Sequence, residues 1–89
     1  MDVDAARLAL QAAVGKRVRK IRTQQRIGQA ECARAAGMDK SSMYRLEKGE
    51  QNVTLDTLAR IALVLGVEMG DLVAGVVPDP ALVTDGVDA

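Results

Sequence analysis

The sequence has 89 residues and a formal net charge of zero, with no histidine and one cysteine. A chain of this length forms one domain at most. The missing histidine and the single cysteine exclude the usual zinc sites and remove the commonest general base. We therefore expect no enzyme, no metal, no cofactor and no small-molecule ligand.

The cellular location is expected to be the cytoplasm, at the nucleoid. No apolar run approaches the ~18 residues that a membrane span needs, and the first ten residues lack the basic region of a secretory signal. Cys32 has no partner for an internal disulfide, which suits a reducing compartment.

Charge is segregated along the chain even though its total is zero. Residues 14–48 contain ten basic and three acidic side chains, whereas residues 49–89 contain one basic and seven acidic. The basic part is a candidate surface for phosphates. The alternative is an ordinary solvated helix face, and charge alone favours that alternative.

Helical periodicity predicts a first helix that begins near Asp4, and strand signals are nearly absent. Gly15 interrupts this helix at a cost of about 1 kcal/mol relative to alanine. A break or a frayed start at Gly15 is therefore an alternative. The apolar residues of the pattern are Val3, Ala6, Leu10, Val14, Val18 and Ile21.

Two short helices are predicted next, at residues 29–36 and at about 39–48. Gly37 and Gly49 follow them, where a left-handed backbone commonly ends a helix. Asp39 is the expected N-cap of the second of these two helices.

A fourth helix is predicted at residues 55–65, capped by Thr54 and ended by Gly66. A last short helix, at about 69–73, begins after Glu68, whose negative charge suits a helix start. The residues expected to face the core from these two helices are Leu55, Leu58, Ala62, Leu65, Leu72 and Val73.

The tail, residues 74–89, contains Pro78 and Pro80, which break helices. We expect it to be disordered or loosely extended. The alternative is that its apolar stretches at 76–77 and 81–83 bind a protein partner, as an added strand for example.

Residues 29–48 have the spacing of a helix-turn-helix unit. Ala33 is small enough for two helices to cross closely, and Gly37 can take the positive φ that the turn requires. Met43 and Leu46 lie one turn apart and can both be buried. Tight helix pairs with a glycine turn also occur in bundles that do not bind DNA.

The opposite face of the third helix carries mixed hydrogen-bonding and cationic side chains, which a major groove can accept. An isolated exposed tyrosine would need no explanation, but Tyr44 lies between cations on this face. The residues of the face are Lys40, Ser41, Tyr44, Arg45 and Lys48.

Between residues 14 and 72 the sequence resembles the Cro and phage-repressor type of helix-turn-helix domain, also called the XRE type. The resemblance rests on two single residues and five short stretches of sequence. These are Gln29 and Ala33, and residues 15–22, 36–37, 45–49, 55–62 and 65–67. It implies an all-α, five-helix domain at 14–73, with an N-terminal extension at 1–13 that is helical or frayed. The tail at 74–89 completes the chain.

The resemblance also implies roles for individual residues. Lys40, Ser41, Tyr44 and Arg45 fall on base-reading positions, and Gln29, Lys48 and Asn52 fall on positions that contact the DNA backbone. A phosphate contact is the alternative for Lys40, and Tyr44 is expected either to cover a thymine methyl group or to reach a phosphate. Arg22 and Glu47 match a mostly buried ion pair, for which a surface cation at Arg22 is the alternative. Among the remaining cations, Lys16, Arg19 and Lys20 are expected to add non-specific affinity through counterion release.

Three residues depart from the family pattern. Gly28 replaces the usual serine or asparagine N-cap, so a side-chain phosphate contact is lost. Cys32 replaces a core leucine and is interpreted as a small buried hydrophobe, with a redox sensor as the alternative. Glu50 stands where a cation is frequent, which weakens the expected phosphate contact there.

The function expected from the sequence is that of a sequence-specific transcriptional regulator, a repressor that binds a palindromic operator as a homodimer. An antitoxin with the same DNA-binding domain is an alternative, as is a protein-interaction module that keeps the fold without binding DNA. The dimer surface is expected near the C-terminal end, in the last helix or the tail, with the N-terminal extension as the alternative. The tail is also a candidate site for a protein partner.

Overall fold

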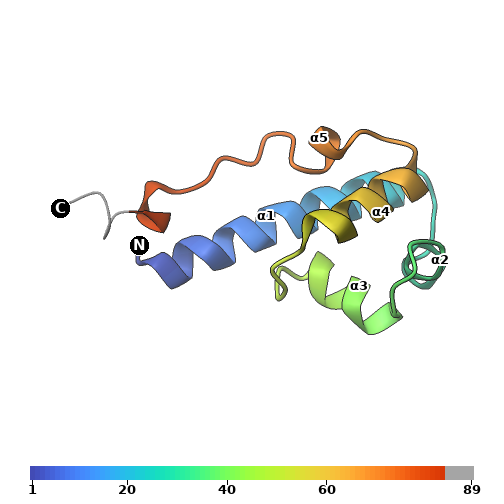
Figure 1. Ribbon diagram of the computed structural model, residues 1–89, viewed down its shortest axis with the longest axis horizontal. Helices are drawn as coiled ribbons and strands as arrows, with labels where there is room; N and C mark the ends of the chain where they lie inside the picture. Colours follow the sequence, from blue (N-terminus) through green and yellow to red (C-terminus); the bar gives the residue numbers. More distant parts are fainter. Residues whose placement is uncertain (84–89) are drawn as a thin grey trace.

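The computed structural model describes residues 1–83, and these residues form an all-α domain. Figure 1 shows a long first helix with the shorter helices packed along it. None of the helices in this range is long and apolar enough to span a bilayer. The elements are α1 (Val3–Gln24), α2 (Gln29–Ala35), α3 (Lys40–Glu47), α4 (Leu55–Leu65), α5 (Met69–Leu72) and the 3-10 turn η1 (Pro80–Leu82).

Helix α1 runs without a break through Gly15, so the alternative of an interruption there does not occur. The Asp2 carboxylate caps its start by accepting from the Ala5 amide at 2.7 Å. A Cβ at Gly15 would lie 2.8 Å from the carbonyl oxygen of Glu47, and closer still to that of Leu46. The glycine therefore lets the backbone of α1 touch the end of α3, which outweighs its low helix propensity.

The turn between α2 and α3 has the predicted geometry. Gly37 has a φ of 71°, and the Met38 amide closes the end of α2 by donating to the Ala33 carbonyl at 2.8 Å. Ala33, Met43 and Leu46 are all buried in the core. Small and apolar residues at these positions therefore set the two helices against each other as the sequence pattern predicts.

The helix ends follow the sequence except at Asp39. The Thr54 hydroxyl accepts from the Thr57 amide at 3.1 Å, and Gly66 ends α4 with a φ of 67°. Asp39 occupies the N-cap position of α3, but its side chain makes no capping hydrogen bond. Its carboxylate accepts from the Ser42 hydroxyl at 3.4 Å instead, so the predicted N-cap position is confirmed, but the side chain does not make the usual capping hydrogen bond.

Two of the predicted core residues are exposed. Leu55 is 75% exposed and Val73 is 40% exposed. Helical side chains point back towards the N-terminus of their helix, so Leu55, in the first turn of α4, projects past the core. Val73 follows the last residue of α5, and only Leu72 beside it is buried. The buried face of α4 consists of Leu58, Ile61, Ala62 and Leu65.

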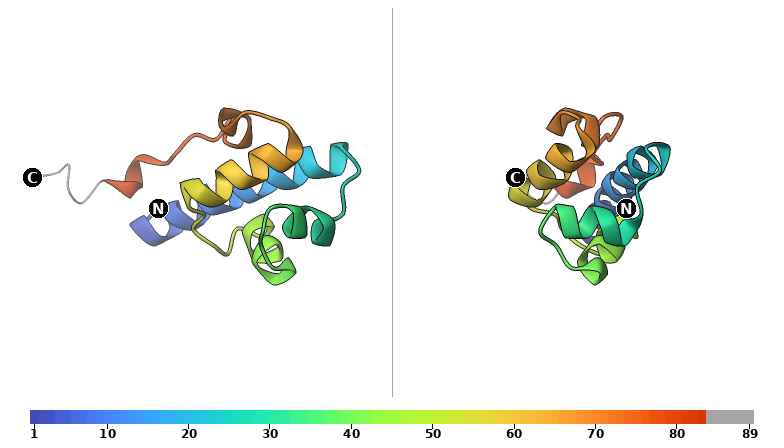
Figure 2. Two further views of the ribbon diagram at one scale, coloured as in Figure 1. Left: turned by 45° about the vertical axis from the view of Figure 1, so that its right-hand side comes forward. Right: turned by 90° about the vertical axis from the view of Figure 1, so that its right-hand side faces the viewer.

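The described part of the tail, residues 74–83, returns along α1 towards its start (Figure 1). Val76 packs against the core, and η1 contacts α1, where Ala6 is buried. In the left view of Figure 2 this segment runs above α1, and α3 lies below it. Residues 84–89, the end of the predicted tail, lie outside the described residues.

Candidate nucleic-acid interface

The outer face of α3 is the candidate interface. All of the side chains predicted to read bases are exposed, while Met43 and Leu46 on the opposite face are buried. Figure 1 shows α3 at the edge of the molecule, where no other element covers its outer face. The exposed residues predicted from the sequence as base-reading are Lys40, Ser41, Tyr44 and Arg45.

The exposed face of α3 is divided into two sides. On one side, the Arg45 guanidinium donates to the Ser42 hydroxyl at 3.4 Å, and this hydroxyl donates to Asp39. On the other side, the Lys48 ammonium lies over the ring of Tyr44, 5.3 Å from its centroid. Tyr44 and Arg45, which the sequence placed in one base-reading group, therefore have different partners.

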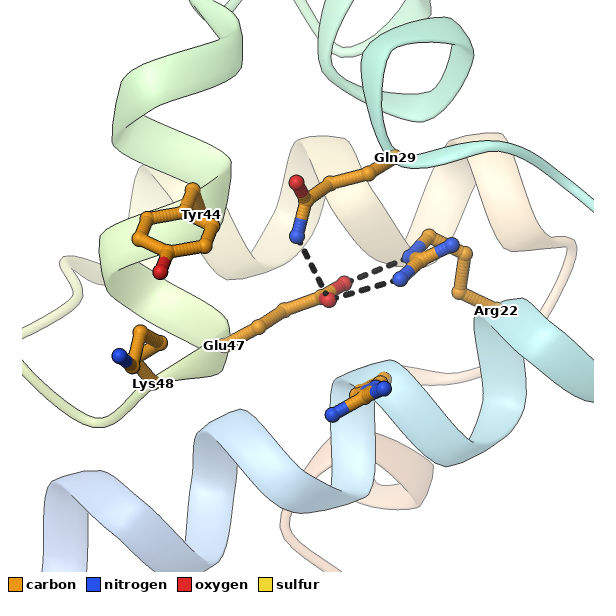
Figure 3. A pocket seen from close by; sticks show the side chains of 6 residues that line it. Arg22, Gln29, Tyr44, Glu47 and Lys48 are labelled. Atoms are coloured by element: carbon orange, nitrogen blue, oxygen red, sulfur yellow. Dashed lines mark hydrogen bonds and ion pairs between the residues drawn. The ribbon is translucent and has the colours of Figure 1, made fainter.

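A hollow of about 300 Å³ opens between α1, α2 and α3. Figure 3 shows Tyr44 and Lys48 from α3 and Gln29 from the start of α2 around it. Arg19 of α1 also lines the hollow, together with the ion pair of Arg22 and Glu47. Three helices thus bring cations and polar groups together beside the candidate interface.

Arg22 and Glu47 form a buried ion pair that ties α1 to α3 (Figure 3). The Nε and Nη2 groups of Arg22 donate to the two carboxylate oxygens at 2.6 and 2.8 Å, and Nη1 donates to the Ile27 carbonyl at 2.8 Å. The hydrogen bond to Glu47 raises the pKa of Arg22 above its ordinary value, against the opposing effect of burial. The guanidinium therefore stays charged, and its two hydrogen bonds keep it aligned with the carboxylate of Glu47.

Gln29 lies at the first position of α2, where its side-chain amide donates to Oε1 of Glu47 at 3.0 Å. The amide nitrogen has a second hydrogen, which leaves one donor for a ligand in the hollow. At the position before it, Gly28 supplies no side-chain cap, and its amide donates to the Glu31 carboxylate at 3.4 Å.

The structure divides the cations that the sequence predicted as backbone contacts. Arg19 lines the hollow beside α3, whereas Lys16 and Lys20 line a different hollow beside residues 74–76. Arg17, next to them, donates to the Asp71 carbonyl at 2.7 Å and so fastens α5 to α1. Asn52 is exposed in the loop between α3 and α4, and Glu50 is exposed in the same loop.

Sequence reasoning missed Ser42 and Asp39 as neighbours of Arg45. The three residues follow one another at intervals of three, which places them on one side of α3, so the spacing was a usable signal. Cys32 is fully buried in the core, and burial raises the pKa of its thiol. That environment agrees with the interpretation of Cys32 as a buried hydrophobe.

Comparisons with solved structures place this fold among transcription regulators. The restriction-modification controller protein C.AhdI from Aeromonas hydrophila is 31% identical, with a TM-score of 0.69 over 70% of this chain and 94% of that chain. The clp gene regulator ClgR from Corynebacterium glutamicum is 26% identical, with a TM-score of 0.70 over 72% of this chain and 68% of that chain.

A third structure shares the fold: an HTH_3 family transcriptional regulator from Vibrio cholerae, 22% identical, with a TM-score of 0.72 over 89% of this chain and 43% of that chain. A search of curated proteins gave no significant match. Residues 17–77 match the Cro/C1-type HTH DNA-binding domain. The resemblance recognised in the sequence is thereby confirmed, and the chain belongs to the Cro/C1-type helix-turn-helix DNA-binding family.

Proposed function

We propose that this protein is a sequence-specific transcriptional repressor that binds a palindromic operator as a homodimer. The observation that carries the proposal is the division of α3 into a buried and an exposed face. Met43 and Leu46 anchor the helix, and cationic and hydrogen-bonding side chains cover the side that a major groove would meet. Occupying an operator with this face is sufficient for repression by steric exclusion.

Arg45 is the principal base reader in this proposal. Its guanidinium can form two hydrogen bonds with O6 and N7 of a guanine, a contact worth about 1–3 kcal/mol of discrimination. The Ser42 hydroxyl, 3.4 Å from Nη2, limits the directions that the guanidinium samples. Ser41 and Lys40, exposed on the same helix, are secondary readers.

Dimerisation is proposed because one small module binds DNA weakly, whereas two linked modules gain from effective concentration. Leu72 is fully buried and is not available for pairing. Met69 and Val73, on either side of it, are 39% and 40% exposed. We assign the dimer contact to this outer side of α5, in line with the sequence-based preference for the C-terminal end.

Selection of bound sequences from a pool of random duplexes tests the proposed function. A repressor of this kind should enrich a palindrome whose half-site centres lie about 34 Å apart, one helical turn of DNA. The Arg45→Ala variant is the matched control, and it should enrich a site with one base position relaxed. Absence of any enriched sequence would overturn the proposal. Failure to bind any duplex would also overturn it and would favour the alternative of a protein-interaction module.

A further inference from the structure

We propose that the hollow between α1, α2 and α3 is a phosphate clamp, in which Tyr44 holds the DNA backbone together with Arg19 and Lys48 and reads no base. This inference rests on the proposed function, because it assumes that α3 approaches a duplex. It decides between the two roles that the sequence left open for Tyr44, a base contact and a phosphate contact, and it gives Arg19 a specific contact in place of a general electrostatic one.

The positions of the side chains carry the first step. Tyr44, Lys48 and Arg19 all line the same hollow, whose volume is about 300 Å³. Figure 3 shows Tyr44 and Lys48 directed to one side of α3, above α1. Arg45, the next residue, does not line the hollow and donates to Ser42 instead. Tyr44 therefore faces the hollow, while the side chain best suited to read a base has a different neighbour.

The charges around the hollow carry the second step. Glu47 is the one acidic residue in its lining, and both of its oxygens are occupied by Arg22, with Gln29 as a third donor. Arg19 and Lys48 therefore leave the hollow with an uncompensated positive charge. An anionic group is the ligand that such a site favours.

The available hydrogen-bond groups identify the anion. Arg19, Lys48 and the second amide hydrogen of Gln29 are donors without acceptor capacity, and the Tyr44 hydroxyl can donate as well. The N7 and O6 edge of a guanine also presents acceptors, but this edge is neutral, whereas the acceptor oxygens of a phosphate carry a full negative charge. Converging donors that include two uncompensated positive charges therefore match a phosphate better than a base edge.

The ring of Tyr44 has a second effect, on Lys48. The ammonium group lies 5.3 Å from the ring centroid, within the range of a cation–π contact. This contact restricts a flexible side chain to the neighbourhood of the hollow before any ligand arrives. Tyr44 is therefore a positioning residue for Lys48 as well as a donor in its own right.

Binding of Tyr44→Phe to the selected operator and to an unrelated duplex tests the clamp. Phenylalanine keeps the ring under Lys48 and removes only the hydroxyl. Affinity for both duplexes should fall by the same factor, on the order of 10-fold for one hydrogen bond to a charged group. The sequence preference, measured by selection, should stay as in the wild type, and a change of preferred base at one position would overturn the clamp.

Arg19→Gln gives a second readout, with Arg7→Gln as the control. Arg7 lies near the start of α1, is exposed and pairs with Asp4. The slope of log affinity against log salt should fall by about one for Arg19→Gln and stay constant for Arg7→Gln. An unchanged slope for Arg19→Gln would overturn the clamp even if Tyr44→Phe weakens binding.

Two further measurements are needed. One distinguishes free phosphate from the DNA backbone as the ligand of the hollow, and the other distinguishes failure of the clamp from failure of the proposed repressor function. Titration with inorganic phosphate, followed by amide chemical shifts of Tyr44 and Lys48, should give no saturation at millimolar concentrations. Saturation would assign the hollow to free phosphate and overturn its assignment to DNA. Failure of the repressor proposal would appear as loss of sequence preference in the wild type, while the salt slopes on an unrelated duplex would still test the clamp.

Discussion

The carboxylate of Glu47 in α3 is held by two parallel hydrogen bonds from the guanidinium of Arg22 in α1. The two side chains are 3% and 9% exposed, and the remaining polar groups of the pair have partners in Ile27 and Gln29. A buried pair with this many hydrogen bonds fixes orientation more than it adds net stability. It therefore determines how the recognition helix is presented by the rest of the domain.

Arg22→Ala should lower the free energy of unfolding by about 3–5 kcal/mol, because Glu47 would remain buried without its counter-charge. Urea unfolding followed by circular dichroism measures the loss, and Arg34→Ala, at an exposed position of α2, is the control. Replacing both partners, as Arg22→Met with Glu47→Leu, should restore most of the stability. An unchanged midpoint for Arg22→Ala would show that the pair is not buried in solution.

Gly15→Ala should destabilise the protein although alanine favours helices. The new methyl group would meet the carbonyl oxygens of Leu46 and Glu47, and these belong to backbone that cannot rotate away. Gly70→Ala is the matched control, since no atom lies within 4 Å of its added carbon. Thermal unfolding should show a lower midpoint for Gly15→Ala and an equal or higher midpoint for Gly70→Ala. The gain in free energy of unfolding for Gly70→Ala is at most about 1 kcal/mol. Equal shifts would contradict the close approach of α1 and α3.

Thr54→Ala should cost about 0.5–2 kcal/mol, because the Thr57 amide loses its acceptor at the start of α4. Asp39→Ala should cost clearly less, since the Asp39 side chain accepts no amide hydrogen bond of α3. Chemical denaturation of the two variants compares the caps directly. A larger loss for Asp39→Ala would show that its carboxylate does cap α3 in solution.

Arg45→Ala and Lys48→Ala should weaken DNA binding in different ways. The first should lose about 1–3 kcal/mol on the selected operator and little on unrelated duplexes. The second should weaken binding to all duplexes alike and reduce the salt slope by about one. Fluorescence anisotropy on both duplexes at several salt concentrations gives both quantities. Arg45 is no base reader if its variant binds the operator as the wild type does.

Cys32 should give the protein a distinct alkaline pH dependence. Burial raises the pKa of its thiol in the folded state above that of the unfolded chain. The resulting stabilisation is complete below the unfolded pKa, ordinarily about 8.5, and is lost as pH rises through the folded value. The stability difference between pH 8 and pH 10 should therefore be smaller in Cys32→Ala. An identical difference in both proteins would contradict a buried, protonated thiol.

The sequence predicted what depends on local spacing and missed what depends on distant partners. Ala33, Gly37, Met43 and Leu46 lie within one short unit, so their types and intervals alone indicated two crossed helices. Gly15 looked like an interruption because its reason, the carbonyl of Leu46, is 31 residues away in the chain. No periodicity of α1 could reveal that contact.

Exposure at the helix ends and the hollow beside α1 were also beyond local pattern. Periodicity put Leu55 on the apolar face of α4, but whether that face is covered in the first turn depends on neighbouring elements. The same limit applies to the hollow beside α1, which Tyr44 lines together with Arg19 from a distant part of the chain. The contacts of Tyr44 with Lys48 and of Asp39 with Ser42 span one helical turn, so the spacing alone could have indicated them.

The return of residues 76–83 along α1 makes neighbours of the two stretches that are farthest apart in the described sequence. The first turns of α1 reach beyond the helix-turn-helix unit, and η1 packs against this part of the helix. Opening of the returning segment would expose Ala6 and release those turns together with it, as one local unfolding unit. Proteolytic removal of either end should therefore loosen the other end, while α2 and α3 keep their contacts with α1 and the core.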